Sequence, residues 1–141
     1  MAFRAVVQIP GRAYALNCEF LQSEFGRCDV VHRALLRYTN ALLVQLSHTA
    51  VCNKFHSVEE RFCRWLLVAQ DTTSSDSIPM TQDALARVLG SRRASISDVA
   101  GCFQKSGTIQ YSRGVIRILA RKRLEAGACE CYKTISAVHV R

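Results

Sequence analysis

The longest hydrophobic pattern lies between Asp29 and Phe55, a stretch that contains neither glycine nor proline. Its apolar side chains recur at spacings of three and four, which predicts a helix with two neighbouring apolar stripes. About 25 helical residues span roughly 37 Å, longer than a domain of this size needs internally. We therefore predict a parallel homodimer through this helix, with a long core helix of a monomeric bundle as the alternative. The expected interface residues are Val31, Leu35, Tyr38, Leu42, Leu46 and Thr49.

The segment before this helix gives weaker signals. The run from Ala5 to Ile9, which precedes Pro10 and Gly11, is typical of a short strand that enters a turn. From there to about Cys28 the periodicity is too weak to support an assignment. Such a short segment has little to pack on by itself, so it resembles the end of a larger unit or a cap on a partner.

Signals for regular structure return after the long helix. Ser57 and Glu60 form a capping-box pattern, which predicts a second helix that continues through Leu67. The polar run from Asp71 to Ser77 has no periodicity and is predicted as a surface loop. The apolar residues around Pro79 return the chain to the core as a short strand.

Two short helical patterns separated by a glycine follow this strand. Thr81 can cap the first helix, and Gly90 can end it because glycine readily adopts a positive φ. This order is that of a helix-turn-helix, whose second helix enters the major groove of DNA. The expected buried faces are Leu85, Val88 and Leu89 in the first helix and Ile96, Val99 and Phe103 in the second.

Polar and basic residues cluster at the N-terminal end of the second helix. Arginine can donate to O6 and N7 of guanine, while hydroxyls and helix-end N–H groups can hold phosphates. We therefore expect this end to read bases, through Arg92, Arg93, Ser95 and Ser97.

A hairpin signal comes next, because apolar residues alternate on both sides of Ser112, Arg113 and Gly114. A hairpin directly after a recognition helix is a wing, and basic residues on it would face the phosphate backbone. The alternative is a small α+β domain whose charges are merely solvated. The expected phosphate contacts are Thr81, Arg113, Arg117 and Arg121.

Residues from about Leu35 to Tyr132 resemble the C-terminal half of Crp/Fnr-type bacterial transcription regulators. The runs MTQDALARVLGSRRASISDVAG and IQYSRGVIRIL carry most of the resemblance. It implies a homodimer on a palindromic operator near promoters, with RNA polymerase as a candidate second partner. The expected fold is mainly α with a small β component (α+β). We expect a remnant of the effector β-roll at 1–28, a dimerisation helix at 29–55 and a winged helix-turn-helix domain at 56–141.

The chain also departs from that family. Ala94 stands where the cyclic-AMP receptor branch has an acidic residue, and Asp98 stands where a basic residue is common, so an operator sequence cannot be transferred. Only Ala5 to about Phe25 resembles the N-terminal effector domain. We therefore predict that the protein does not bind cyclic AMP, and that it is either a fragment of a longer regulator or a naturally shortened one.

Composition narrows the class of partner. The 141 residues carry a net charge of +8, which favours a polyanionic partner such as double-stranded DNA. There is no long uncharged apolar run and no secretory signal, so we expect a cytoplasmic protein without a membrane span. Seven cysteines, an odd number without a CxxC pair, indicate reduced thiols rather than a disulfide framework, with a redox role as a minor alternative.

Candidate metal and catalytic residues are few. His48, Cys52 and His56 are spaced four apart, which can suit zinc on one helix, and Cys129 and Cys131 form a second pair. Neither group offers four ligands, so we interpret both as structural and expect no metal and no cofactor. Motifs for a nucleophile or a phosphate loop are absent from the sequence, so we expect no enzyme activity.

The sequence therefore predicts a dimeric, sequence-specific DNA-binding transcription regulator. The alternative is an interaction module that forms heterodimers with full-length relatives and modulates them.

Overall fold

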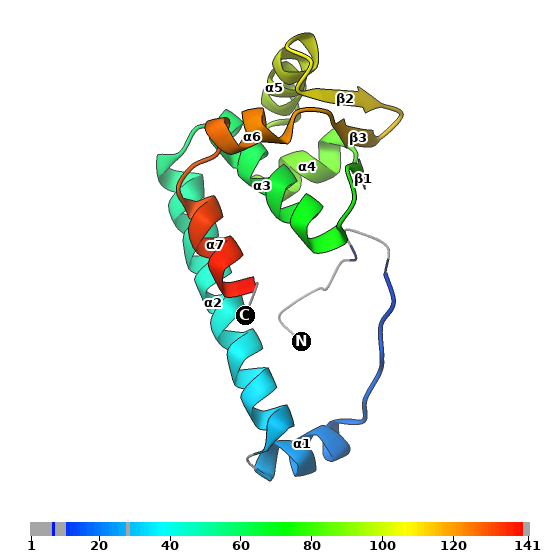
Figure 1. Cartoon of the computed structure of the whole chain (residues 1–141), viewed down its shortest axis with the longest axis vertical. Coiled ribbons are helices and arrows are strands. Elements are labelled where there is room, and N and C mark those ends of the chain that lie inside the picture. The colour runs from blue at the N-terminus through cyan, green and yellow to red at the C-terminus, as the bar shows by residue number, and fades with distance from the viewer. Residues whose placement is uncertain (1–6, 8–10, 28, 140–141) are drawn as a thin grey trace.

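A computed structural model describes residues 7, 11–27 and 29–139, apart from the side chain of residue 139 (Figure 1). Within these residues the fold is mainly helical with one small antiparallel sheet, which confirms the predicted α+β class. Except for Val7, the strand predicted from Ala5 to Ile9 lies outside the described residues. The elements are α1 (Cys18–Gly26), α2 (Val30–Phe55), α3 (Val58–Thr73), β1 (Ser77–Pro79), α4 (Gln82–Val88), α5 (Arg93–Lys105), β2 (Ile109–Ser112), β3 (Val115–Ile118), α6 (Arg121–Gly127) and α7 (Cys131–His139).

Helix α1 is an element that the hydrophobic pattern did not predict. Asn17 caps it by accepting a hydrogen bond from the Glu19 N–H at 2.9 Å, but none of its residues is buried. The Phe25 ring at its end stacks on His32 of α2, with ring centres 4.1 Å apart. Because α1 has no buried face, periodicity alone could not reveal it.

Helix α2 confirms the long helix expected between Asp29 and Phe55. The Asp29 carboxylate accepts the Val30 N–H at 2.8 Å, and the helix ends at His56. Its 26 residues correspond to about 39 Å. Only Ala41 and Cys52 are buried, so most of its surface faces solvent in the single chain.

Helix α3 is the centre of the hydrophobic core. The predicted capping box is present: the Ser57 N–H donates to Glu60 Oε2 at 2.7 Å, and the Glu60 N–H donates to Ser57 Oγ at 3.2 Å. Phe62, Leu66 and Leu67 are fully buried, and Phe62 stacks on Phe103 of α5. Helices α4, α5 and α6 and the sheet complete this core.

The predicted loop from Asp71 to Ser77 starts later than expected, because α3 continues to Thr73. The hydroxyls of Thr72 and Thr73 donate to carbonyls one turn earlier, each at 2.7 Å. Ser74 then ends the helix with a φ of 52°. The polar composition was misleading here, since an exposed helix end that bonds to its own backbone has the same composition as a loop.

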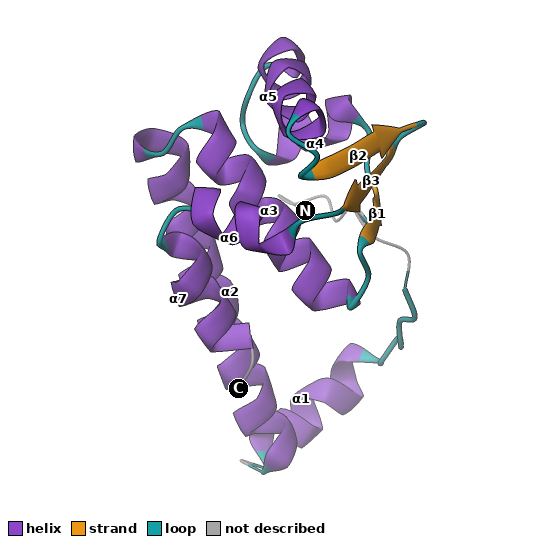
Figure 2. Cartoon of the chain, turned by 45° about the horizontal axis from the view of Figure 1, so that its top comes forward, coloured by secondary structure: helices purple, strands orange, loops and turns teal. Residues whose placement is uncertain are grey.

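The three strands form a small antiparallel sheet in the order β1-β3-β2, which confirms the predicted hairpin. Arg113 and Gly114 connect β2 and β3 with φ values of 48° and 75°, as a two-residue turn of type I′ requires. Figure 2 shows this hairpin standing beside α5, as a wing does beside a recognition helix.

Helix α7 returns along α2 and places Ile135 in a fully buried position (Figures 1 and 2). The last helix of the chain, α7, therefore packs against the long helix α2 rather than against the sheet. Among the described residues, no helix combines the length and the apolar character that crossing a membrane would require.

Candidate nucleic-acid interface

The corner between α4 and α5 has the geometry of a helix-turn-helix. Thr81 caps α4, with its Oγ1 accepting the Ala84 N–H at 3.2 Å. Gly90 adopts a φ of 57° in the turn, and a Cβ at this position would lie 3.4 Å from Asn53 Nδ2. The prediction that a glycine with positive φ separates the two helices is confirmed.

Arg61 attaches this corner to the end of α2. Its buried guanidinium donates from Nη1 to the Leu89 carbonyl at 2.7 Å and to Asn53 Oδ1 at 3.1 Å. Asn53 thus lies beside Gly90 and also accepts a hydrogen bond from Arg61, the residue that binds the carbonyl of Leu89 just before the turn. The orientation of the two short helices is fixed relative to α2 by directional hydrogen bonds.

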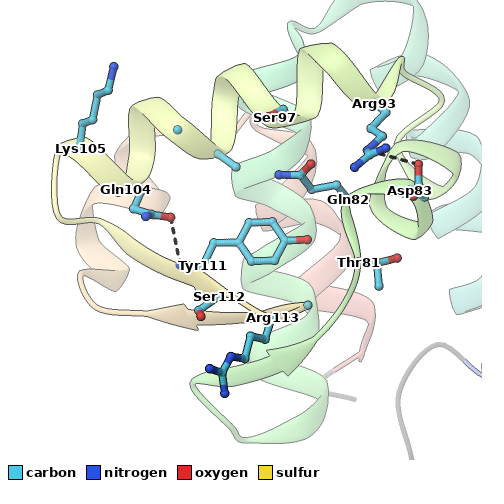
Figure 3. Close-up of a pocket in the computed structure, with 13 residues that line it drawn as sticks. Thr81, Gln82, Asp83, Arg93, Ser97, Gln104, Lys105, Tyr111, Ser112 and Arg113 are labelled. Atoms are coloured by element: carbon cyan, nitrogen blue, oxygen red, sulfur yellow. Dashed lines mark hydrogen bonds and ion pairs between the residues drawn. The ribbon is translucent and has the colours of Figure 1, made fainter.

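A groove of about 510 Å³ runs between α5 and the wing (Figure 3). Gly101 of α5 is among the lining residues, and an added Cβ there would meet nothing within 4 Å. A glycine at such an open position allows a polymer backbone or a base edge to approach closely. Side chains from α4, α5 and the hairpin line the groove: Thr81, Gln82, Asp83, Arg93, Ser97, Gln104, Lys105, Tyr111, Ser112 and Arg113.

The charge in this groove is mostly positive. Arg93, Lys105 and Arg113 contribute cations, and Asp83 is the acidic lining residue. Arg93 Nε lies 3.5 Å from Asp83 Oδ1, and both side chains are more than half exposed. An exposed ion pair of this kind contributes little energy, so Arg93 can exchange the carboxylate for another acceptor.

Comparison with known protein families identifies the domain that contains this groove. Residues 60–126 match the Crp-like helix-turn-helix domain. The helix-turn-helix and the wing described above lie within this Crp-like domain. Comparison with curated proteins gave no match.

Solved structures of Crp/Fnr-type regulators share this fold. A Crp/Fnr-family regulator of Eubacterium rectale is 26% identical with a TM-score of 0.56, over 77% of this chain and 50% of that one. FixK2 of Bradyrhizobium japonicum is 19% identical with a TM-score of 0.67, over 79% and 58%. The CRP-family regulator TTHB099 of Thermus thermophilus is 22% identical with a TM-score of 0.60, over 81% and 56%. The chain thus spans about half the length of these proteins.

Tyr111 holds the wing against α5. Its hydroxyl donates to the Met80 carbonyl at 2.8 Å, and its N–H donates to Gln104 Oε1 at 3.2 Å. Burial, together with the charge of Asp83, raises the pKa of Tyr111, so the hydroxyl keeps its proton as a donor. The groove walls are therefore cross-linked rather than free to separate.

The structure brings four of the predicted DNA-binding residues together. Thr81, Arg93, Ser97 and Arg113 line the groove of the Crp-like domain. Arg92 is exposed at the N-cap of α5 and makes no side-chain cap. The other predicted residues lie outside the groove lining: Ser95 is half-buried on α5, and Arg117 is exposed on β3.

Arg121 is the predicted phosphate contact whose position argues against that role. Its guanidinium bonds to Asp71 at 2.8 Å, to Glu125 at 2.7 Å and to the Tyr132 hydroxyl at 2.7 Å. Burial disfavours the charged form, but these carboxylate bonds outweigh it and raise the pKa of Arg121. These bonds hold α6 against α3 and α7, so a phosphate would compete with two carboxylates for the Arg121 guanidinium.

Sequence reasoning missed several groove residues. Gln104 lies eleven residues after Arg93, on the same face of α5 as Ser97 and Gly101, because these positions follow helical spacing. That spacing was readable before the fold was known. Its basic neighbour Lys105 also lines the groove.

Proposed function

We propose that this chain is a sequence-specific DNA-binding transcription regulator that acts as a homodimer on a palindromic operator. The observation that carries the proposal is the groove between α5 and the wing, whose walls present Arg93, Ser97 and Arg113. A recognition helix of this type enters the major groove, and the hairpin then lies against the neighbouring phosphates.

The exposed face of α5 supports base readout. Arg92 and Arg93 stand at its first turn, where an arginine can donate twice to guanine O6 and N7. Ser95 and Ser97 can bond to bases or to phosphates. The exposed carboxylate of Asp98, one turn further along, can accept from cytosine N4 and disfavours a phosphate at that point.

Phosphate contacts follow from the capping residue and the wing. Thr81 Oγ1 accepts a backbone N–H, which leaves its O–H free to donate to a phosphate oxygen. Arg113 at the hairpin tip and Arg117 on the exposed face of β3 supply cations. These contacts fix the orientation of the domain on DNA without reading sequence.

The homodimer is proposed from the uncovered side of α2. Tyr38, Leu42 and Leu46 are 65%, 39% and 56% exposed and recur at spacings of four. Val31, Leu35 and Thr49 continue the same line and are partly buried. An apolar line along a helix of about 39 Å is the pattern of a helix that pairs with its copy.

Further properties belong to the same proposal. The strands described in residues 7, 11–27 and 29–139 all belong to the wing sheet, so we propose that these residues do not bind cyclic AMP. We propose a cytoplasmic, non-enzymatic regulator with RNA polymerase as a second partner. Calorimetry with cyclic AMP tests the first point, and micromolar binding would overturn it.

The test of DNA recognition begins with selection of duplexes from a random palindromic library, followed by polarization titrations. Arg93→Ala should weaken specific binding by about 1–3 kcal/mol and relax selectivity at one base position. Arg27→Ala is the matched control, because it removes the same charge from an exposed site at the end of α1, far from α5 (Figure 1).

Equal weakening on specific and random duplexes would contradict base readout by Arg93. Failure of the wild-type homodimer to select any duplex would overturn the proposal. Recovery of selectivity on mixing with a full-length relative would then favour the heterodimer alternative.

A further inference from the structure

Four metal-ligating side chains meet at the end of α2, and none of them lines the groove between α5 and the wing. Cys52 lies in the last turn of α2 and His56 is its C-cap, while Cys129 precedes α7 and Cys131 begins it. Their ligand atoms all lie within 4.8 Å of one another. The two groups that the sequence analysis judged too small for a metal site thus combine into one cluster of four ligands, and His48 is not part of that cluster.

We propose that Cys52, His56, Cys129 and Cys131 form a structural zinc site. Three thiolates and one imidazole are a common ligand set for structural Zn²⁺, which prefers tetrahedral coordination. Cys52 and His56 come from one helix end at a spacing of four, and the two cysteines of a CxC pair come from the chain segment packed beside it.

The distances suit a single ion. Cys52 Sγ and Cys129 Sγ are 3.6 Å apart, and Cys131 Sγ lies 3.9 Å from His56 Nδ1. With Zn–S bonds of about 2.3 Å and Zn–N bonds of about 2.0 Å, the edges of a tetrahedron are roughly 3.8 Å between sulfurs and 3.5 Å between sulfur and nitrogen. These two distances differ from the tetrahedral edges by only a few tenths of an ångström, and the other ligand atoms, all within 4.8 Å of one another, need to approach by about 1.3 Å at most.

The surroundings are those of a closed site. Cys52, Cys129 and Cys131 are 0%, 4% and 2% exposed and form a cluster separate from the main core. With four protein ligands, no position is left for a substrate or a catalytic water.

Neighbouring charges support a bound cation and its thiolates. Glu130 Oε1 lies 3.2 Å from His56 Nε2, so a carboxylate orients the imidazole and leaves Nδ1 facing Cys131. The buried guanidinium of Arg64 is close enough to Cys52 to interact with it electrostatically. Three thiolates around Zn²⁺ carry one net negative charge, which this arginine offsets.

The fold assigns the site a mechanical role. It would fasten the start of α7 to the last turn of α2, at the point where the long helix meets the DNA-binding domain (Figure 1). An iron–sulfur cluster would need its ligands spread around several iron atoms, which ligand atoms this close together do not allow. A Cys52–Cys129 disulfide is the competing use of the same thiols.

The experiment measures metal in the full chain, purified without chelator from cells grown with added zinc. We expect about one zinc per chain by mass spectrometry of the elements, and a loss of at least about tenfold in Cys131→Ser and Cys129→Ser. Cys102→Ser is the matched control, because Cys102 is an exposed thiol outside the cluster, and it should keep its zinc.

Wild-type protein provides a readout that does not depend on the folding of a variant. Replacing zinc with Co²⁺ should give the strong visible bands of tetrahedral cobalt with sulfur-to-cobalt charge transfer. The proposal is overturned by less than about 0.1 zinc per chain together with only weak bands of hydrated cobalt, or by a mass two daltons lower that reports a disulfide.

Discussion

The winged helix domain and helix α2 bury their apolar side chains in opposite ways. In the domain, α3 places Phe62, Leu66 and Leu67 at 0% exposure against the sheet and the short helices. In α2, by contrast, Leu43 and Leu46 are more than half exposed, and only two of 26 residues are buried. The same leucine-rich composition thus closes a core in one region and leaves a surface open in the other.

This difference separates folding from assembly. A core that is closed within the chain contributes to stability at any protein concentration, since its contacts need no partner. An open apolar line contributes only when a second molecule covers it, so its effect depends on concentration. Substitutions in the two regions should consequently appear in different measurements.

The largest effect is expected when two exposed leucines of α2 become charged. The double variant Leu42→Asp with Leu46→Asp removes two leucines from each chain, four in all, from the proposed homodimer interface. Each buried leucine contributes about 1.5–3 kcal/mol of dimerisation free energy. The dissociation constant of the dimer, measured by sedimentation, should rise at least about a thousandfold, while the DNA-binding domain stays folded. Ser47→Asp is the control, because it is exposed and lies about 140° round the helix from Leu42. A double variant that still sediments as a dimer would place the interface elsewhere.

The next effect concerns the closed core. Leu66→Ala deletes a fully buried side chain and should lower the free energy of unfolding by about 2–5 kcal/mol in urea titrations. The control is Leu119→Ala, whose side chain is 55% exposed and whose loss should cost much less. If both substitutions cost the same, the distinction between closed core and open surface fails.

A smaller effect is expected at the corner of the helix-turn-helix. Gly90→Ala places a Cβ at a φ of 57° and 3.4 Å from Asn53 Nδ2, which should cost about 1–2 kcal/mol in unfolding free energy. Gly101→Ala is the opposite case, because an open helical glycine replaced by alanine should stabilise by about 0.5–1 kcal/mol. Thermal unfolding of both variants would show shifts of opposite sign.

The smallest effect is expected at the wing tip. Arg113→Asn removes one charge but retains a residue that tolerates a φ of 48°. DNA affinity should fall similarly on all sequences, and the slope of log affinity against log salt should become shallower by about 1. An unchanged slope would show that Arg113 does not touch a phosphate, and Arg27→Asn serves as the distant control.

Local signals made the DNA-binding region readable from the sequence. The capping pattern at Ser57, the glycine turn at Gly90 and the alternation around Gly114 each depend on residues within a few positions of one another. Their conformations are set mainly by backbone sterics and capping, which do not require knowledge of the fold.

What remained hidden depends on long-range contacts. Arg121 was predicted to contact phosphates as a basic residue beside the wing, and its ion pair with Asp71, 50 positions away, left no local signal. The Cys52 thiol meets Cys129 across 77 positions, so each half of the ligand cluster was judged incomplete. Helix α1 was missed for a different reason, since it buries none of its residues and leaves no hydrophobic pattern.

The hydrogen bonds of Arg61 to Asn53 and Leu89 have a consequence for operator architecture. They join one end of helix α2, which is about 39 Å long, to the helix-turn-helix. A tilt of about 5° at this joint therefore moves the other end of α2 by roughly 3 Å. That displacement equals about one base-pair step of 3.4 Å. In the proposed homodimer, the hydrogen bonds of one buried arginine thus contribute to how strictly two half-sites must be spaced.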